Sequence, residues 1–146
     1  MTSVFDMQPE SVMGATVGTI LIVEDDDAIR EFLIHCIETE TPYQALPLAN
    51  QEEVFQHLDT LKETSIVLFI FDLSLLMLTA MDLYDRLCGL IEHEHVPTII
   101  LTTLRPEWTI ESAIIKRGLK LLLKPFDVDD LLRSIEEAFT RPTQLI

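Results

Sequence analysis

The stretch Ile66-Val-Leu-Phe-Ile-Phe-Asp72 places six consecutive apolar residues directly before an acidic one. A strand with one solvated face alternates apolar and polar residues, whereas a strand covered on both faces is apolar throughout. The lack of alternation therefore predicts a buried strand of a parallel sheet, which ends next to Asp72.

Similar apolar runs recur on both sides of this stretch and alternate with segments of helical period. We expect strands at Ile20–Val23, Ala45–Leu48, Ile66–Phe71, Thr98–Leu101 and Leu119–Leu123. We expect helices at Asp27–Glu40, Gln51–Lys62, Thr79–Ile91, Glu107–Arg117 and Val128–Phe139, with Asn50 and Asp127 as N-caps. Five strands and five helices in strict alternation predict an α/β fold, in which helices cover both faces of a five-stranded parallel sheet.

The length of 146 residues suits one domain. We expect a flexible leader at 1–18, a folded domain at 19–140 and a short tail at 141–146. The first 18 residues lack the basic start and apolar core of a secretory signal, and no apolar run reaches the ~18 residues of a membrane span. We therefore expect a cytoplasmic protein, with Cys36 and Cys88 as buried free thiols.

The charge of the chain is strongly negative, at −15, with 10 basic against 25 acidic residues. Binding to phosphate backbones depends on Lys and Arg, and so does docking on anionic membranes. The composition therefore argues against direct binding to nucleic acids or to a membrane surface.

Polar side chains follow the predicted strands at the points where the strands end. The carboxyl ends of parallel strands share one edge of the sheet, which is where open α/β sheets bind ligands. The residues that we expect at this edge are Glu24, Asp25, Asp72, Thr102 and Lys124. Crowded carboxylates favour a hard divalent cation such as Mg²⁺. A carboxylate beside that cation can act as a nucleophile toward phosphorus, with a lysine and a hydroxyl facing the transferred group.

These motifs resemble the receiver domain of two-component response regulators over about residues 19–139. Ile-Leu-Ile-Val-Glu24-Asp25-Asp26 resembles its acidic first strand, and Phe-Asp72-Leu its phosphoacceptor strand. The stretch from Val96-Pro97 to Thr102 resembles its switch-threonine strand, and Leu-Lys124-Pro125-Phe126 its Lys-Pro-Phe signature with a cis Lys-Pro bond. The resemblance implies a flavodoxin-like (βα)5 three-layer sandwich.

By this resemblance the residues take defined roles. Asp72 accepts the phosphoryl group. Mg²⁺ is bound by Asp25, Asp72 and the backbone carbonyl of Ser74, with Glu24 acting through water. Thr102 and Lys124 contact the phosphoryl oxygens. The implied donor is a sensor histidine kinase or a histidine phosphotransfer protein. A downstream protein target is expected on the face formed by the helix at 107–117, the strand at 119–123 and the helix at 128–139. The protein is then a stand-alone signalling module that only phosphorylates and dephosphorylates itself.

Several positions depart from the family pattern. Leu76 stands where the loop after the phosphoacceptor usually has Pro, and Ala80 where it has Gly. Thr103 follows the switch threonine in place of a smaller residue, and Leu121 occupies the position of the switch aromatic. The residues expected to bind Mg²⁺ and the phosphoryl group match the family pattern, while those expected to transmit the signal differ from it.

Three other functions are the alternatives to this one. The altered transmission residues favour an interaction module that works without phosphorylation. An aspartate-nucleophile phosphatase would need a second Asp two residues after Asp72, where this chain has Ser74. A flavodoxin-like electron carrier would need a hydroxyl-rich phosphate loop, and the acidic run Glu24–Asp27 would repel its phosphate.

A few residues outside these motifs also allow a functional interpretation. His93 and His95 alternate, which suits a polar loop better than a metal site on a helix. Trp108 begins a helix, where it is either packed or a partner contact, because Trp is enriched at binding hot spots. The apolar loop Leu75–Leu78 either packs on the neighbouring helix or is exposed for docking, and the sequence leaves both open.

Overall fold

A computed structural model describes residues 18–73, 77–91, 95–103 and 106–140. The expected tail and all but the last residue of the expected leader lie outside these ranges, so the domain boundaries stay predictions.

The five predicted strands form one parallel sheet, as expected. Its order is β2-β1-β3-β4-β5, so that β1, β3 and β4 occupy the interior. The strands are β1 (Thr19–Val23), β2 (Gln44–Leu48), β3 (Ile66–Asp72), β4 (Thr98–Thr102) and β5 (Lys120–Leu123). Every residue of β1 and β4 is buried, and all but one of β3, which explains the continuous apolar runs. The strand order reverses beside β1, where β1 lies next to both β2 and β3.

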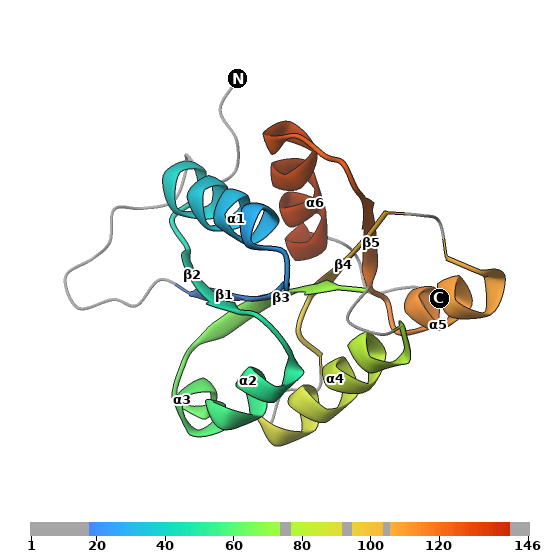
Figure 1. Ribbon diagram of the computed structural model, residues 1–146, viewed down its shortest axis with the longest axis horizontal. Coiled ribbons are helices and arrows are strands. Elements are labelled where there is room, and N and C mark those ends of the chain that lie inside the picture. Colours follow the sequence, from blue (N-terminus) through green and yellow to red (C-terminus); the bar gives the residue numbers. More distant parts are fainter. Residues whose placement is uncertain (1–17, 74–76, 92–94, 104–105, 141–146) are drawn as a thin grey trace.

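Helices cover both faces of the sheet and produce the three predicted layers (Figure 1). The helices are α1 (Asp27–Glu40), α2 (Gln51–Gln56), α3 (Leu58–Lys62), α4 (Met77–Leu90), α5 (Trp108–Lys116) and α6 (Val128–Thr140). Side chains of α1 and α6 pack on one face of the sheet, with Ile20 and Ile22 of β1. Side chains of α2, α3, α4 and α5 pack on the other face, with Leu21 and Val23. Burial of these two apolar clusters is the main source of stability.

The helix expected at Gln51–Lys62 is divided in two, which corrects the prediction. His57 lies between α2 and α3 with φ −107° and ψ 20°. Its backbone N–H donates to the carbonyls of both Glu53 and Val54, and its ring Nδ1 lies 2.8 Å from the carbonyl oxygen of Glu53. The ring therefore competes for an acceptor of the helix, and the regular backbone is interrupted at this residue.

Side-chain caps fix where the helices begin. The Asn50 side chain accepts from the N–H of Glu53 at 2.9 Å, as predicted. The Glu53 carboxylate, however, accepts from Ala49 and not from the cap residue itself. At α6, Asp127 accepts from the N–H of Asp130 at 2.8 Å, and the Asp130 carboxylate accepts from the N–H of Asp127 at 3.1 Å. These reciprocal bonds form a capping box that fixes the segment after Lys124.

Gly118 ends α5 with a positive φ of 73°. Its N–H donates to Ile115, and the N–H of Leu119 donates to Ile114. This pair of bonds is the Schellman arrangement, which requires a left-handed residue and so favours glycine. The turn directs the chain into β5, whose far end delivers Lys124 to the carboxyl edge of the sheet.

Candidate phosphoacceptor and metal site

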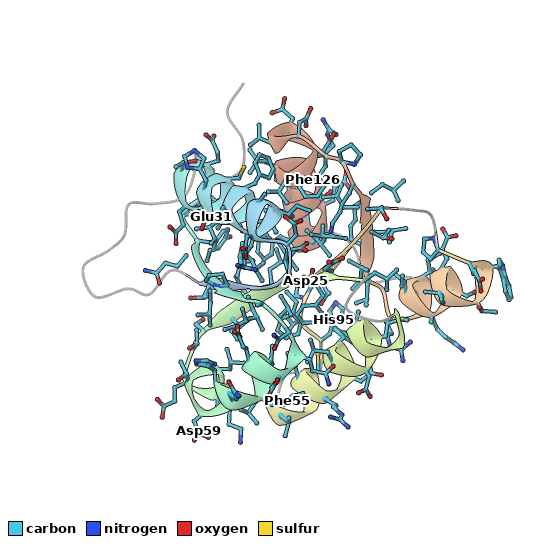
Figure 2. All side chains as sticks on the ribbon, viewed as in Figure 1. Asp25, Glu31, Phe55, Asp59, His95 and Phe126 are labelled. Carbon is cyan, nitrogen blue, oxygen red and sulfur yellow. The ribbon has the colours of Figure 1, made fainter. Side chains whose placement is uncertain are left out.

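Three carboxylates from two strand ends meet at the carboxyl edge of the sheet. Glu24 and Asp25 follow β1, and Asp72 is the last residue of β3. One carboxylate oxygen of each lies within 4.8 Å of the others. Glu24 and Asp72 are buried, whereas Asp25 is exposed. Asp25 is labelled in Figure 2, close to the N-terminal end of α1. The structure therefore brings together the acidic residues that the sequence placed at this edge.

Lys124 faces this cluster from the end of β5. Its Nζ lies 3.1 Å from Oε1 of Glu24 and 3.3 Å from Oδ1 of Asp72, and its side chain is 10% exposed. The following Lys124-Pro125 peptide bond is cis, as the resemblance implied. One ammonium group balances only one of the three carboxylates, so the site retains affinity for a further cation.

Burial and the neighbouring acid raise the pKa of Glu24 to about 7. Removal from water is the larger cause, and the contact with Asp72 adds to it, because two close carboxylates resist ionising together. Burial by itself lowers the pKa of Lys124, but the carboxylates of Asp72 and Glu24 outweigh it, and the net direction is upward. Lys124 is therefore a permanent cation in this site, while Glu24 exchanges its proton near neutral pH.

The oxygen atoms of this cluster fit a bound Mg²⁺. Oε2 of Glu24 accepts from the N–H of Asp26 at 3.1 Å. Oε1 is buried and lies 3.1 Å from the Lys124 ammonium, as a charge contact and not as a well-aligned hydrogen bond. Lys124 is shared between Glu24 and Asp72, so the carboxylate oxygens of the cluster have capacity for a further cation. An all-oxygen set of this kind suits a hard cation that retains its waters.

Arg30 holds the acidic turn in place and was not among the residues predicted from the sequence. Its Nη1 donates to the backbone carbonyl of Glu24 at 2.7 Å. Its Nη2 pairs with the Asp27 carboxylate. The side chain is only 21% exposed. Arg30 lies three residues after Asp27, and this helical spacing of opposite charges was the available signal.

The residues predicted at this site also include Thr102 and Ser74. Thr102 ends β4, is buried, and pairs in register with Leu123 of β5. Its carbonyl accepts from the N–H of Lys124 at 2.7 Å. Asp72 pairs with Leu101, so Thr102 lies one residue beyond the partner of the acceptor aspartate. Ser74 and the loop residues Leu75 and Leu76 lie outside the described residues.

An apolar groove of about 590 Å³ lies beside the acidic cluster. It runs between the first turns of α1 and the segment that follows β5. Its lining residues are Ala28, Ile29, Phe32, Thr103, Lys124, Pro125 and Phe126. Lys124 thus borders both the groove and the carboxylates, so a molecule bound in the groove reaches the edge of the site. No sequence pattern indicated this groove, because it joins residues about 100 positions apart.

The remaining predicted residues have structural roles in the part of the chain that is described. His95 lies with Nδ1 2.7 Å from the hydroxyl of Tyr84, and His93 is outside the described residues. Among the described residues, the acidic cluster is the only group of three or more metal-ligand side chains. Leu121 is half-buried against the cluster that includes α4 and α5, and Ala80 is fully buried there. Both Cys36 and Cys88 are buried free thiols, as expected.

None of the described helices combines the length and the apolar content that a bilayer crossing needs.

Comparison with known proteins agrees with this geometry. The family model of the response regulator receiver domain matches residues 20–136. No curated protein sequence matches the chain. The structure is similar to the chemotaxis response regulator CheY4 of Vibrio cholerae, with 20% identity and a TM-score of 0.70 over 84% of this chain and 99% of that chain.

Two other solved structures are similar. A response regulator receiver domain protein from Clostridium thermocellum has 24% identity and a TM-score of 0.66, over 86% of this chain and 96% of its own. A putative pilus assembly-related protein from Burkholderia pseudomallei has 18% identity and a TM-score of 0.66, over 87% and 92%. At such identities the likeness supports the flavodoxin-like receiver fold alone. The match of the family model, which covers most of the chain, shows that the chain belongs to the response regulator receiver domain family of two-component signalling.

Proposed function

We propose that this receiver accepts a phosphoryl group from a phosphohistidine donor onto Asp72 and thereby changes its binding to a partner protein. The observation that supports this function best is the contact of Lys124 with both Glu24 and Asp72, beside the exposed Asp25. A nucleophilic carboxylate, an acidic pair and a fixed ammonium are the groups that phosphoryl transfer requires.

In the proposed transfer, an Oδ oxygen of Asp72 attacks the phosphorus atom, and the bond between phosphorus and the donor imidazole nitrogen breaks. The nitrogen keeps the electron pair, and an acyl phosphate forms on Asp72. Lys124 neutralises charge on the phosphoryl oxygens, and Thr102 donates its hydroxyl to one of them. Slow hydrolysis of the acyl phosphate, catalysed by the receiver itself, would reset it.

Asp25, Asp72 and the carbonyl of Ser74 would hold the Mg²⁺ ion, and Glu24 would contact it through water. When bound, the ion offsets the charge of the carboxylates and of the incoming phosphoryl group. The convergence of carboxylate oxygens from Glu24, Asp25 and Asp72 supports this assignment. Arg30 supports it indirectly, since it fixes the turn that carries Glu24 and Asp25.

The proposed partners are a sensor histidine kinase or a histidine phosphotransfer protein as donor, and a downstream protein on the face of α5, β5 and α6. The net charge of −15 supports the exclusion of nucleic acids and anionic membranes as direct partners. A cytoplasmic location is part of the proposal, and the two free thiols suit a reducing compartment.

The experiment that tests this function is intact-mass measurement after incubation with acetyl phosphate, with and without Mg²⁺. The wild type should gain one phosphoryl group only with Mg²⁺, and Asp72→Asn should gain none. Undiminished labelling of Asp72→Asn would exclude Asp72 as the acceptor. Labelling of the wild type without added Mg²⁺ and in excess chelator would exclude the metal.

A second function is favoured by Leu121, which replaces an aromatic side chain on β5. Without that aromatic, the receiver would act as an interaction module that binds its partner with or without phosphorylation. Equal partner affinity of the wild type, its phosphorylated form and Asp72→Asn would support this alternative. A change of affinity that requires both Asp72 and the phosphodonor would support the first function.

A further inference from the structure

The apolar groove beside the acidic cluster has the size and the composition of a small-molecule site. Its volume of about 590 Å³ is within the range of pockets that bind small organic ligands. Among the described residues that line it, Lys124 alone is charged. The apolar lining includes Ile29, Phe32, Pro125 and Phe126. A site of this kind suits a ligand that is anionic at one end and apolar at the other.

Two aromatic rings from different elements line the groove. Phe32 of α1 and Phe126 after β5 have ring centroids 6.0 Å apart and ring planes tilted by 52°. Phe126, labelled in Figure 2, packs against the core on the α1 and α6 face of the sheet. Phe32 remains 37% exposed. Apolar surface in the groove therefore contacts water, and an apolar group bound there would gain free energy by removing it from water.

The charged end of the groove coincides with the proposed phosphoacceptor site. Lys124 lines the groove, and its Nζ lies 3.3 Å from Oδ1 of Asp72. A phosphoryl group at this end would be next to both the ammonium and the acceptor carboxylate. The chain carries a charge of −15, so its overall field repels a small anion. Burial of an apolar part in the groove would offset this repulsion, and acetyl phosphate has little such surface to bury.

From these observations we propose that the groove binds the acyl group of acyl phosphates with an apolar chain or ring, and makes these compounds preferred phosphodonors. The inference rests on the proposed function, because it names a donor class for the same site. In the transfer, an Oδ oxygen of Asp72 attacks phosphorus, and the bond between phosphorus and the acyl oxygen breaks. The leaving carboxylate keeps the electron pair and departs from the groove, and an acyl phosphate forms on Asp72.

Labelling rates with two donors of matched reactivity test the preference. Acetyl phosphate and hexanoyl phosphate have leaving carboxylates of nearly equal basicity, so that they differ mainly in the length of the apolar chain. Intact-mass time courses of the full chain with Mg²⁺, at donor concentrations below saturation, give a second-order rate constant for each. The constant for hexanoyl phosphate should be about tenfold higher, because its additional methylene groups are buried in the groove.

Two variants alter the groove in opposite ways. Phe32→Ala removes part of its lining, and Ala28→Phe fills its space, and each should bring the ratio of the two rate constants close to one. Leu90→Ala is the matched control, because Leu90 is 39% exposed on α4 and does not line the groove. This control should keep the wild-type ratio. A general loss of activity affects both donors, so the ratio reports the groove alone.

Alkylphosphonates, which cannot transfer their phosphoryl group, separate this inference from the proposed function. Hexylphosphonate should bind the wild type about fivefold more tightly than methylphosphonate in titration calorimetry, and Phe32→Ala should lose the difference.

The possible outcomes distinguish the groove from the acceptor site. Equal labelling rates with the two acyl phosphates would overturn the inference and leave the proposed function intact. Labelling of Asp72 by neither donor would overturn the proposed function and the donor preference together, even if hexylphosphonate binds preferentially. A preference for hexanoyl phosphate that persists in both Phe32→Ala and Ala28→Phe would place the chain outside the groove, which also overturns the inference.

Discussion

The carboxyl edge of the sheet and the surface around α5 differ in how closely their residues follow the family pattern. At the carboxyl edge, Glu24 and Asp72 are buried and both contact the largely buried side chain of Lys124. On the α5 side, Leu121 stands where an aromatic is usual, and Trp108 extends into solvent. Under the proposed function, the first region would have to match an ion and a phosphoryl group, whose chemistry does not vary between systems. The second has to match a protein surface, which differs between systems. The loss of one transmission residue is therefore compatible with an intact site.

The largest expected effect is at Lys124. Lys124→Met leaves two buried carboxylates without their cation, which should cost about 3 kcal/mol of the free energy of unfolding in excess chelator. Added Mg²⁺ should restore much of this loss, since it supplies positive charge at the same place. Urea unfolding at pH 7.5, with and without Mg²⁺, measures both quantities.

Lys120→Met is the matched control, because Lys120 begins the strand that Lys124 follows and pairs with Glu137 at the surface. Its loss should stay below ~1 kcal/mol and should not respond to Mg²⁺. Equal losses in the two variants would show that the carboxyl edge is no more dependent on its cation than the surface is.

The next effect concerns the pH dependence of stability. The folded pKa of Glu24 is about 7, above its ordinary value of 4.5. Between these values the folded chain holds a proton that the unfolded chain has lost, so metal-free stability should fall as pH rises through this window. Across this window, the proton on Glu24 changes the free energy of unfolding by at most about 3 kcal/mol. Glu24→Gln should flatten this part of the profile, as measured by urea unfolding from pH 4.5 to 7.5 in chelator.

The same proton competes with the metal. The apparent affinity for Mg²⁺ should therefore rise with pH up to about 7 and then level off, and calorimetry should detect proton release on binding below that pH. Identical stability profiles for the wild type and Glu24→Gln, or an affinity that does not change with pH, would contradict the role given to Glu24.

A smaller effect is expected at Arg30. Arg30→Gln removes the donor to the Glu24 carbonyl and the partner of Asp27, which loosens the turn that carries two of the carboxylates. The affinity for Mg²⁺ should fall roughly tenfold. Arg133→Gln is the control, because Arg133 also pairs with an Asp three residues away but lies on α6 in solvent. Titration calorimetry should show no change in affinity for that control, and an equal fall in both variants would indicate a general effect of charge.

The smallest effect on stability is expected at Leu121, where the two regions meet. Leu121→Tyr enlarges a half-buried side chain and should change the free energy of unfolding by less than ~1.5 kcal/mol. Labelling by acetyl phosphate should be unchanged, while the phosphorylation dependence of partner binding should increase. Loss of labelling in this variant would mean that the side chain at position 121 affects the phosphoacceptor site, contrary to this prediction.

The sheet could be predicted because strands that are buried on both faces are apolar throughout, as in the run before Asp72. The meeting of polar residues at one edge could be predicted because the carboxyl ends of parallel strands lie together. The division of Gln51–Lys62 at His57 could not be predicted, because it depends on a ring that bonds its own helix. The spacing of Arg30 from Asp27 was visible in the sequence, but the bond from Arg30 to the Glu24 carbonyl required the folded turn. The groove around Phe126 was missed because it joins distant elements. The exposure of Trp108 likewise required the structure.

Lys124 contacts two carboxylates at once, and under the proposed function the charges of this cluster bound the electrostatic change that phosphorylation would produce. With all three carboxylates ionised, the cluster and Lys124 carry two negative charges, which a bound Mg²⁺ would cancel. An acyl phosphate would replace one negative charge on Asp72 by about two. The net change is about one charge, and salt screens it beyond ~8 Å. A partner bound farther away than this would sense little of the charge itself. A partner at that distance would instead respond to a conformational change that is transmitted through packed side chains.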